Sequence, residues 1–83
     1  MLQELLTGDM VVGVKQSRRA IQNGHARQVF LAQDADPGLT EPLKLQCMIL
    51  GIPVTSCCSM LELGEAAGIQ VGAAVVALLK KDH

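Results

Sequence analysis

The basic residues of this 83-residue chain gather between Gly13 and Arg27. This stretch holds four of the seven lysines and arginines and one histidine, and it holds no acid. They are Lys15, Arg18, Arg19, His25 and Arg27. On a helix, cations spaced three and four residues apart share one face, where they and the free backbone N–H groups can bind phosphates. Lys15 and Arg19 can also reach guanine O6 and N7, and Gln16 can hydrogen-bond a base edge. The alternative is a solvated face of an ordinary domain, because the net charge is −1.

Three glycines stand four residues apart, at Gly64, Gly68 and Gly72. The chain has no G-x-G-x-x-G or Walker pattern, so these glycines do not predict a nucleotide cradle. We expect Gly68 to cap a helix, and Gly64 and Gly72 to mark places where backbones approach closely. A ligand-facing loop over 68–72 is the alternative.

The carboxylates and thiols do not predict catalysis. Asp34 and Asp36 lack a neighbouring histidine or lysine for acid–base work, and we expect them to stabilise a turn. Cys47, Cys57 and Cys58 form neither a C-x-x-C motif nor a zinc-ligand pattern. We expect reduced thiols that pack as small hydrophobic side chains, with no metal or other cofactor and no enzymatic activity.

Hydrophobic periodicity predicts strands that alternate with helices around these residues. We expect helices over 1–6, 14–23, 39–50 and 60–67, and strands over 10–12, 28–32, 52–57 and 73–79. Pro42 falls in the first turn of its predicted helix, and Ser59 and Glu62 have the spacing of a capping box. We expect Leu43, Cys47 and Leu50 to face inward, and Met48 and Met60 to fill the core.

The length predicts a single domain, and the alternation of strands and helices predicts an α/β fold with helices on both faces of its sheet, in three layers. Hydrophobic residues make up 49% of the chain and charged residues 18%, and Phe30 is the only aromatic residue. The first residues carry acids and no basic region typical of a secretory signal. The longest apolar run, 71–79, is shorter than the roughly 20 residues that span a bilayer. We therefore expect a cytoplasmic monomer without a membrane partner.

Three stretches together resemble a known family of RNA-binding proteins. They are 13–21 (GVKQSRRAI), 32–37 (AQDADP) and 63–74 (LGEAAGIQVGAA). Their order and spacing resemble the kink-turn RNA-binding superfamily of ribosomal proteins, which includes the archaeal large-subunit kink-turn protein and the small bacterial YbxF-like proteins. The resemblance extends over nearly the whole chain and implies an α-β-α sandwich around a mixed four-stranded sheet.

The resemblance also implies a site. In this superfamily the helix after the first glycine enters the widened major groove of a kink-turn and contacts tandem sheared G·A pairs, while a later loop packs over extruded bases. The residues implied for the helix are Gly13, Lys15, Gln16 and Arg19, and those for the loop are Ile69, Gln70 and Val71. We add Arg18 as a candidate RNA-binding residue because it lies on the same basic face.

Lys15-Gln16 departs from the Asn-Glu pair of archaeal and eukaryotic members and resembles the bacterial branch. A lysine in place of a bidentate amide predicts weaker base discrimination and a steeper salt dependence. We expect structured RNA as the partner, on the ribosome or in an element such as a riboswitch. The alternative is a protein-interaction module of the same fold that does not bind RNA.

Overall fold

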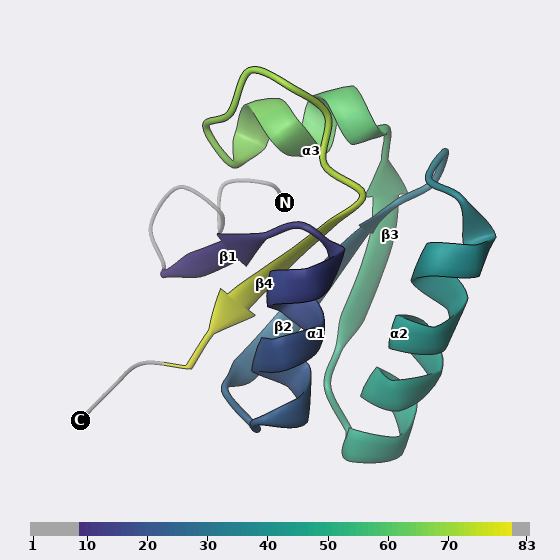
Figure 1. Cartoon of the computed structure of the whole chain (residues 1–83), viewed down its shortest axis with the longest axis vertical. Coiled ribbons are helices and arrows are strands. Elements are labelled where there is room, and N and C mark those ends of the chain that lie inside the picture. Colours follow the sequence, from purple (N-terminus) through teal and green to yellow (C-terminus); the bar gives the residue numbers. More distant parts are fainter. Residues whose placement is uncertain (1–8, 81–83) are drawn as a thin grey trace.

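The computed structural model describes residues 9–80, without the side chain of Cys57, as four strands and three helices (Figure 1). The strands are β1 (Met10–Val12), β2 (Ala26–Ala32), β3 (Val54–Cys58) and β4 (Val75–Leu79), and the helices are α1 (Val14–Gln22), α2 (Pro37–Leu50) and α3 (Met60–Ala66). The helix predicted over 1–6 lies outside the described residues. Within residues 9–80, no helix has the length and apolar character needed to cross a lipid bilayer.

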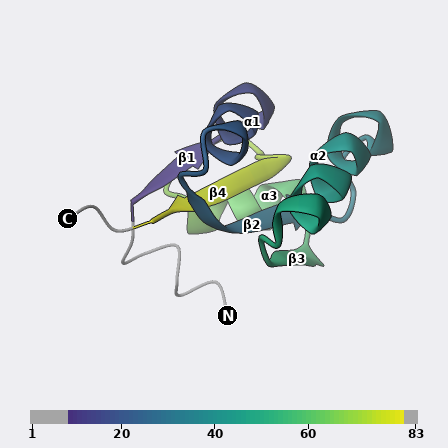
Figure 2. The same ribbon diagram turned by 90° about the horizontal axis from the view of Figure 1, so that it is seen from below.

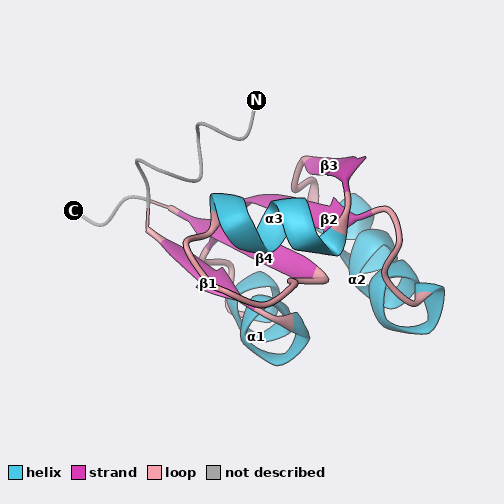
Figure 3. Ribbon diagram, turned by 90° about the horizontal axis from the view of Figure 1, so that it is seen from above, coloured by secondary structure: helices cyan, strands magenta, loops and turns pink. Residues whose placement is uncertain are grey.

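The strands form one mixed sheet in the order β1-β4-β2-β3. β4 runs antiparallel to both of its neighbours, whereas β2 and β3 are parallel and are joined by α2, because parallel strands require a crossover connection. Helices α1 and α2 cover one face (Figure 2), and α3 covers the other (Figure 3). The predicted three-layer α/β architecture and the mixed four-stranded sheet are both confirmed.

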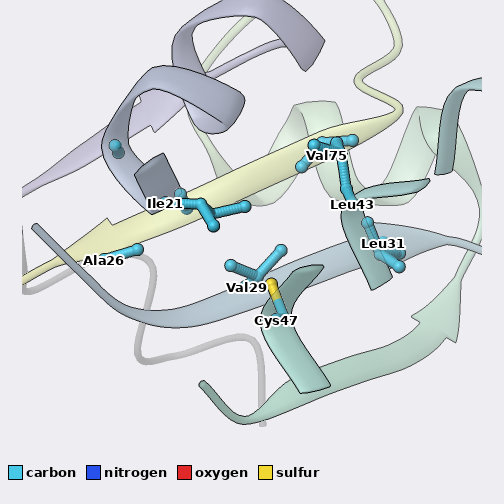
Figure 4. Packing of buried hydrophobic residues seen from close by; sticks show 9 residues of the cluster. Ile21, Ala26, Val29, Leu31, Leu43, Cys47 and Val75 are labelled. Atoms are coloured by element: carbon cyan, nitrogen blue, oxygen red, sulfur yellow. The ribbon is translucent and has the colours of Figure 1, made fainter. Parts of the chain in front are cut away.

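Successive side chains of the central strands point to opposite faces of the sheet, as the two-residue period of a strand requires. On β4, Val75 (Figure 4) and Ala77 pack in the cluster that contains residues of α1 and α2, whereas Val76 and Leu78 pack in the cluster that contains Leu63 of α3. All four side chains are fully buried, and each branched one stabilises the fold by roughly 1.5–3 kcal/mol. Apart from Phe30, Cys47 and Cys58, the buried residues of the two core clusters are aliphatic.

Helix α2 begins at Pro37, two residues before the predicted start. A carboxylate oxygen of Asp36 accepts a hydrogen bond from the backbone N–H of Gly38 at 2.9 Å, which caps the helix and confirms a turn-stabilising role for this aspartate. Pro42 therefore lies inside the helix, and its predicted place in the first turn is wrong. Its ring removes one backbone hydrogen bond from the second turn of α2.

The inward stripe of α2 also differs from the prediction. Thr40, Leu43 and Cys47 are buried, at spacings of three and four residues. Leu50 is 52% exposed and Met48 is 69% exposed, so their predicted inward placement is wrong. The helix has apolar residues on several sides, and its buried apolar residues, Leu43 and Cys47, belong to the core cluster that also contains residues of α1, β2 and β4.

Strands β3 and β4 start later than predicted, each for a different reason. β3 begins at Val54, after Pro53, which has no N–H for a sheet hydrogen bond. β4 begins at Val75 rather than at residue 73, because the N–H of Ala73 donates to the carbonyl oxygen of Met60 in α3.

The capping box of α3 is confirmed, since Ser59 and Glu62 each accept the other's backbone N–H.

The thiol of Cys47 gives the fold a pH dependence. Burial raises the pKa of this thiol above its ordinary value of 9.0, so the folded chain keeps the proton that the unfolded chain loses. Alkaline pH therefore favours unfolding. We expect the free energy of unfolding to fall more steeply between about pH 8 and pH 10 in the wild type than in Cys47→Ala, as measured by urea denaturation. Equal slopes for the two proteins would contradict this prediction.

Candidate nucleic-acid interface

Gly13 sets the start of α1. Its φ angle of 101° lies in a region that other residues rarely adopt, which explains why glycine stands between β1 and α1. The N–H of Gly13 donates to the carbonyl oxygen of Val75 at 2.8 Å, and the carbonyl of Gly13 accepts from Ser17 at 3.0 Å. These bonds hold the first turn of α1 beside the start of β4.

The first turn of α1 has no side-chain cap and no acidic residue. Helices α2 and α3, by contrast, are capped by Asp36 and by Ser59 with Glu62. The first N–H groups of an α-helix have no partner within the helix and carry its positive partial charge. The start of α1 can therefore receive an anion or a base-edge acceptor.

The predicted basic face of α1 points away from the core. Ser17, Ala20 and Ile21 are buried against the sheet, and the stripe of small residues explains how α1 packs closely on it. The four polar candidates on this helix are all exposed: Lys15, Gln16, Arg18 and Arg19. The helix spacing therefore places three cations and one amide on the accessible side.

The loop after α3 begins with a Schellman motif at Gly68. The N–H of Gly68 donates to the carbonyl oxygen of Glu65 at 3.1 Å, and the N–H of Ile69 donates to that of Gly64 at 3.0 Å. Gly68 has a φ angle of 82°, as this motif requires. Its predicted role as a helix cap is confirmed.

The backbone of the same loop lies in close contact with α3. A Cβ atom on Gly64 would overlap the carbonyl oxygen of Val71, and one on Gly72 would lie 3.1 Å from the Cβ of Met60. The predicted close approach of backbones at both glycines is therefore confirmed. A carboxylate oxygen of Asp34 accepts the N–H of Met60 at 2.7 Å, which joins α3 to the end of β2.

The three loop candidates differ in exposure. Val71 is 69% exposed and Gln70 is exposed, whereas Ile69 is partly buried and packs against the core beneath α3. Val71 and Gln70 are thus available to a partner. Ile69 contributes to the position of the loop as well as to its surface.

The helix and loop candidates lie at the same end of the sheet, where β1 enters α1 and the α3–β4 loop enters β4 (Figure 1). His25 and Arg27 follow the far end of α1. Asp34 and Asp36 have structural partners at their carboxylates. Over residues 9–80, no group of three histidine, cysteine, aspartate or glutamate side chains is placed to hold a metal ion.

A shallow groove beside α1 contains residues that the sequence did not single out. It has a volume of about 140 Å³, and Gln16 and Arg19 line it together with Asn23 and His25. Gln16, Arg19 and Asn23 are spaced three and four residues apart, so they follow one side of the helix. That spacing was the signal in the sequence that could have identified Asn23.

Comparison with known proteins places this architecture among RNA-binding proteins. The chain is 43% identical to the RNA-binding protein YbxF of Geobacillus stearothermophilus over 76 residues, which are 92% of this chain and 93% of that protein. It is 36% identical to an RNA-binding protein of Bacillus pumilus over 70 residues, 84% of this chain and 85% of the relative. The solved structure of the Giardia lamblia 15.5kD RNA binding protein matches with a TM-score of 0.85 and 27% identity, covering 98% of this chain and 69% of that one.

A family model gives the broadest match. The model of the ribosomal protein L7Ae/L30e/S12e/Gadd45 family matches residues 2–83. This range includes all four strands and three helices, as well as both segments of the candidate interface. The chain therefore belongs to the ribosomal protein L7Ae/L30e/S12e/Gadd45 family.

Proposed function

We propose that this chain binds structured RNA at kink-turns that contain tandem sheared G·A pairs, and that it stabilises their bent form. The start of α1 enters the widened major groove, where Lys15, Gln16 and Arg19 contact base edges and phosphates. Arg18 adds a phosphate contact on the same face. Membership of the family and the similarity to RNA-binding proteins support RNA as the partner.

The observation that carries this proposal is the uncapped, acid-free first turn of α1 with exposed Lys15, Gln16 and Arg19 beside it. The burial of Phe30 favours structured RNA over single strands. Phe30 is the only aromatic residue of the chain and is 1% exposed, so it offers no stacking platform for unpaired bases. A protein of this kind must read base edges, phosphates and shape.

The α3–β4 loop supplies the second contact. Val71 presents an apolar side chain to extruded bases, and Gln70 can hydrogen-bond them. The straight RNA cannot touch α1 and this loop together, so binding shifts the RNA population toward the bent form without any chemical step.

The test compares a kink-turn RNA with a control in which Watson–Crick pairs replace the G·A pairs, at two salt concentrations. We expect tight binding to the first RNA, weak binding to the second, and a loss of affinity as salt rises. Equal weak binding to both RNAs would overturn the proposal. A protein-interaction module of the same fold would then be the better explanation of the net charge of −1.

Val71 and Ile69 make a matched pair for the loop. Val71→Asp places a carboxylate on a side chain that is 69% exposed, so we expect weaker RNA binding at an unchanged melting temperature. Ile69→Asp puts a charge against the core, so we expect it to lower the melting temperature as well. If Val71→Asp lowered the melting temperature in step with binding, Val71 would be a structural residue and not a contact.

A further inference from the structure

A second concave surface lies at the opposite end of the sheet from the candidate interface. It is a cavity of about 340 Å³, formed where α1 and α2 end and where β2 and β3 begin. Its size is within the range of pockets that bind small molecules or parts of larger ligands. Neither the sequence motifs nor the proposed kink-turn contacts make use of it.

The cavity combines an apolar lining with two cations. Ile21 and Ile52 are among its aliphatic lining residues, and Arg27 and Lys80 contribute exposed charged groups. No acidic residue among those that the structure describes lines this cavity or the groove beside α1. Phosphates joined by sugars match this chemistry, because the phosphates bind cations and the sugar edges pack against aliphatic groups.

The ends of two helices also lie at this cavity, and their partial negative charge opposes an anion. A helix C-terminus carries about half an elementary charge. Near these ends, the carbonyls of Ile21 and Ala20 in α1 accept the N–H groups of Gly24 and His25, and those of Met48 and Cys47 in α2 accept the N–H groups of Gly51 and Ile52. Arg27 and Lys80 each bring a full positive charge to the cavity, against about half a negative charge at each helix end.

The groove beside α1 and the cavity are separate hollows that share no lining residue. Gln16 and Arg19 of the proposed interface line the groove together with His25, and Lys80 lines the cavity. The carbonyl of His25 accepts a hydrogen bond from the N–H of Lys80 at 2.7 Å, so the two hollows adjoin at this pair of residues.

We propose that this groove and the cavity bind the sugar–phosphate backbone of an RNA stem that extends beyond the kink, with its phosphates at Arg27 and Lys80. The inference rests on the proposed function, since the kink must first dock at the start of α1. It adds a backbone contact that carries no sequence information and strengthens binding to longer RNAs.

The length of the sheet sets the length of stem required. Five residues separate Val75, beside the start of α1, from Lys80, which is about 17 Å along an extended strand. An A-form RNA duplex rises by about 2.8 Å per base pair, so the stem must continue for about six base pairs to reach Lys80. A minimal kink-turn with shorter stems cannot make this contact.

The experiment measures the Kd of the full chain for a short-stemmed kink-turn RNA and for two RNAs in which one or the other stem is longer by about ten base pairs. For wild type we expect one of the extended RNAs to bind more tightly than the short one. The double variant Arg27→Gln/Lys80→Gln should bind this extended RNA no more tightly than the short one. It should also lower the slope of log K against log salt by about two on the extended RNA, and not on the short RNA. Lys80→Gln alone should lower it by about one, whereas Lys44→Gln, the same charge change on exposed α2, should leave it unchanged.

The outcomes separate this inference from the proposed function. If all three kink-turn RNAs bind equally and the double variant changes nothing, while the Watson–Crick control still binds weakly, the inference is overturned and kink-turn binding stands. If the kink-turn RNAs bind no better than that control, both fail. An effect of the double variant on the short RNA as large as on the extended RNAs would also overturn the inference, because the contact would not depend on stem length.

Discussion

Replacing Arg19 by alanine is expected to weaken the binding of kink-turn RNA by about 1–3 kcal/mol, which is roughly a 5- to 150-fold increase in Kd. Arg19 is exposed on α1 and lines the groove beside it, where its guanidinium can reach a guanine edge in the opened major groove. Removing it deletes both a charge and a planar pair of donors. The Kd is measured by titration at one fixed salt concentration.

Two further variants show which property of Arg19 matters. Arg19→Lys keeps the charge but loses the bidentate geometry, so we expect a salt dependence near that of wild type with poorer discrimination against the Watson–Crick control. Lys44→Ala removes a charge from α2, away from the interface, and should leave the Kd unchanged. An unchanged Kd for Arg19→Ala would remove α1 from the proposed interface.

Replacing Gly64 by alanine is expected to destabilise the protein by about 1–3 kcal/mol. A new Cβ would overlap the backbone carbonyl of Val71, and backbone cannot rotate away as a side chain can. Either α3 or the α3–β4 loop must move. Because that loop carries Gln70 and Val71, we expect RNA affinity to fall together with the free energy of unfolding.

Gly38→Ala is the matched control, since Gly38 is also a helical glycine. Its new Cβ would come no closer than 3.3 Å to a carboxylate oxygen of Asp36, a side chain that can shift. Glycine-to-alanine changes in helices are otherwise stabilising by roughly 0.5–1 kcal/mol, so this control should be neutral or slightly stabilising. Equal stability of Gly64→Ala and wild type, by urea denaturation, would show that the loop does not rest on α3.

Local patterns were sufficient to predict most of the fold. The spacing of Ser17, Ala20 and Ile21 predicts the buried side of α1, and Ser59 with Glu62 predicts the start of α3. These features depend on residues within one or two helical turns. Such short-range relations are visible in a single sequence.

Contacts between distant segments account for what the sequence did not reveal. The bond from the Met60 N–H to Asp34 spans 26 positions, and nothing near either residue indicates it. Likewise, α2 has apolar residues on several sides, and only its packing on the sheet decides that Cys47 is buried and Met48 is not. The start of α2 was misplaced because Asp36-Pro37 serves both as a turn and as a helix start.

The candidate interface was predicted in part. The basic face of α1 followed from charge and spacing, and the α3–β4 loop only from the family resemblance. The groove that includes Asn23 and His25, and the cavity with Arg27 and Lys80, required the structure. The groove depends on how α1 lies against β1 and β4, and the cavity depends on how the ends of α1 and α2 meet the start of β2. No local pattern specifies these arrangements.

The position of β4 in the sheet has a consequence for synthesis on the ribosome. Of the four strands within residues 9–80, β4 is made last, yet it lies between β1 and β2 and contributes buried residues to both faces. A nascent chain that lacks β4 leaves β1 without its partner strand and both cores incomplete. Translation proceeds at roughly 5–20 residues per second, so the earlier segments wait for several seconds before this strand arrives. The native sheet can therefore close only after β4 itself has left the ribosomal tunnel.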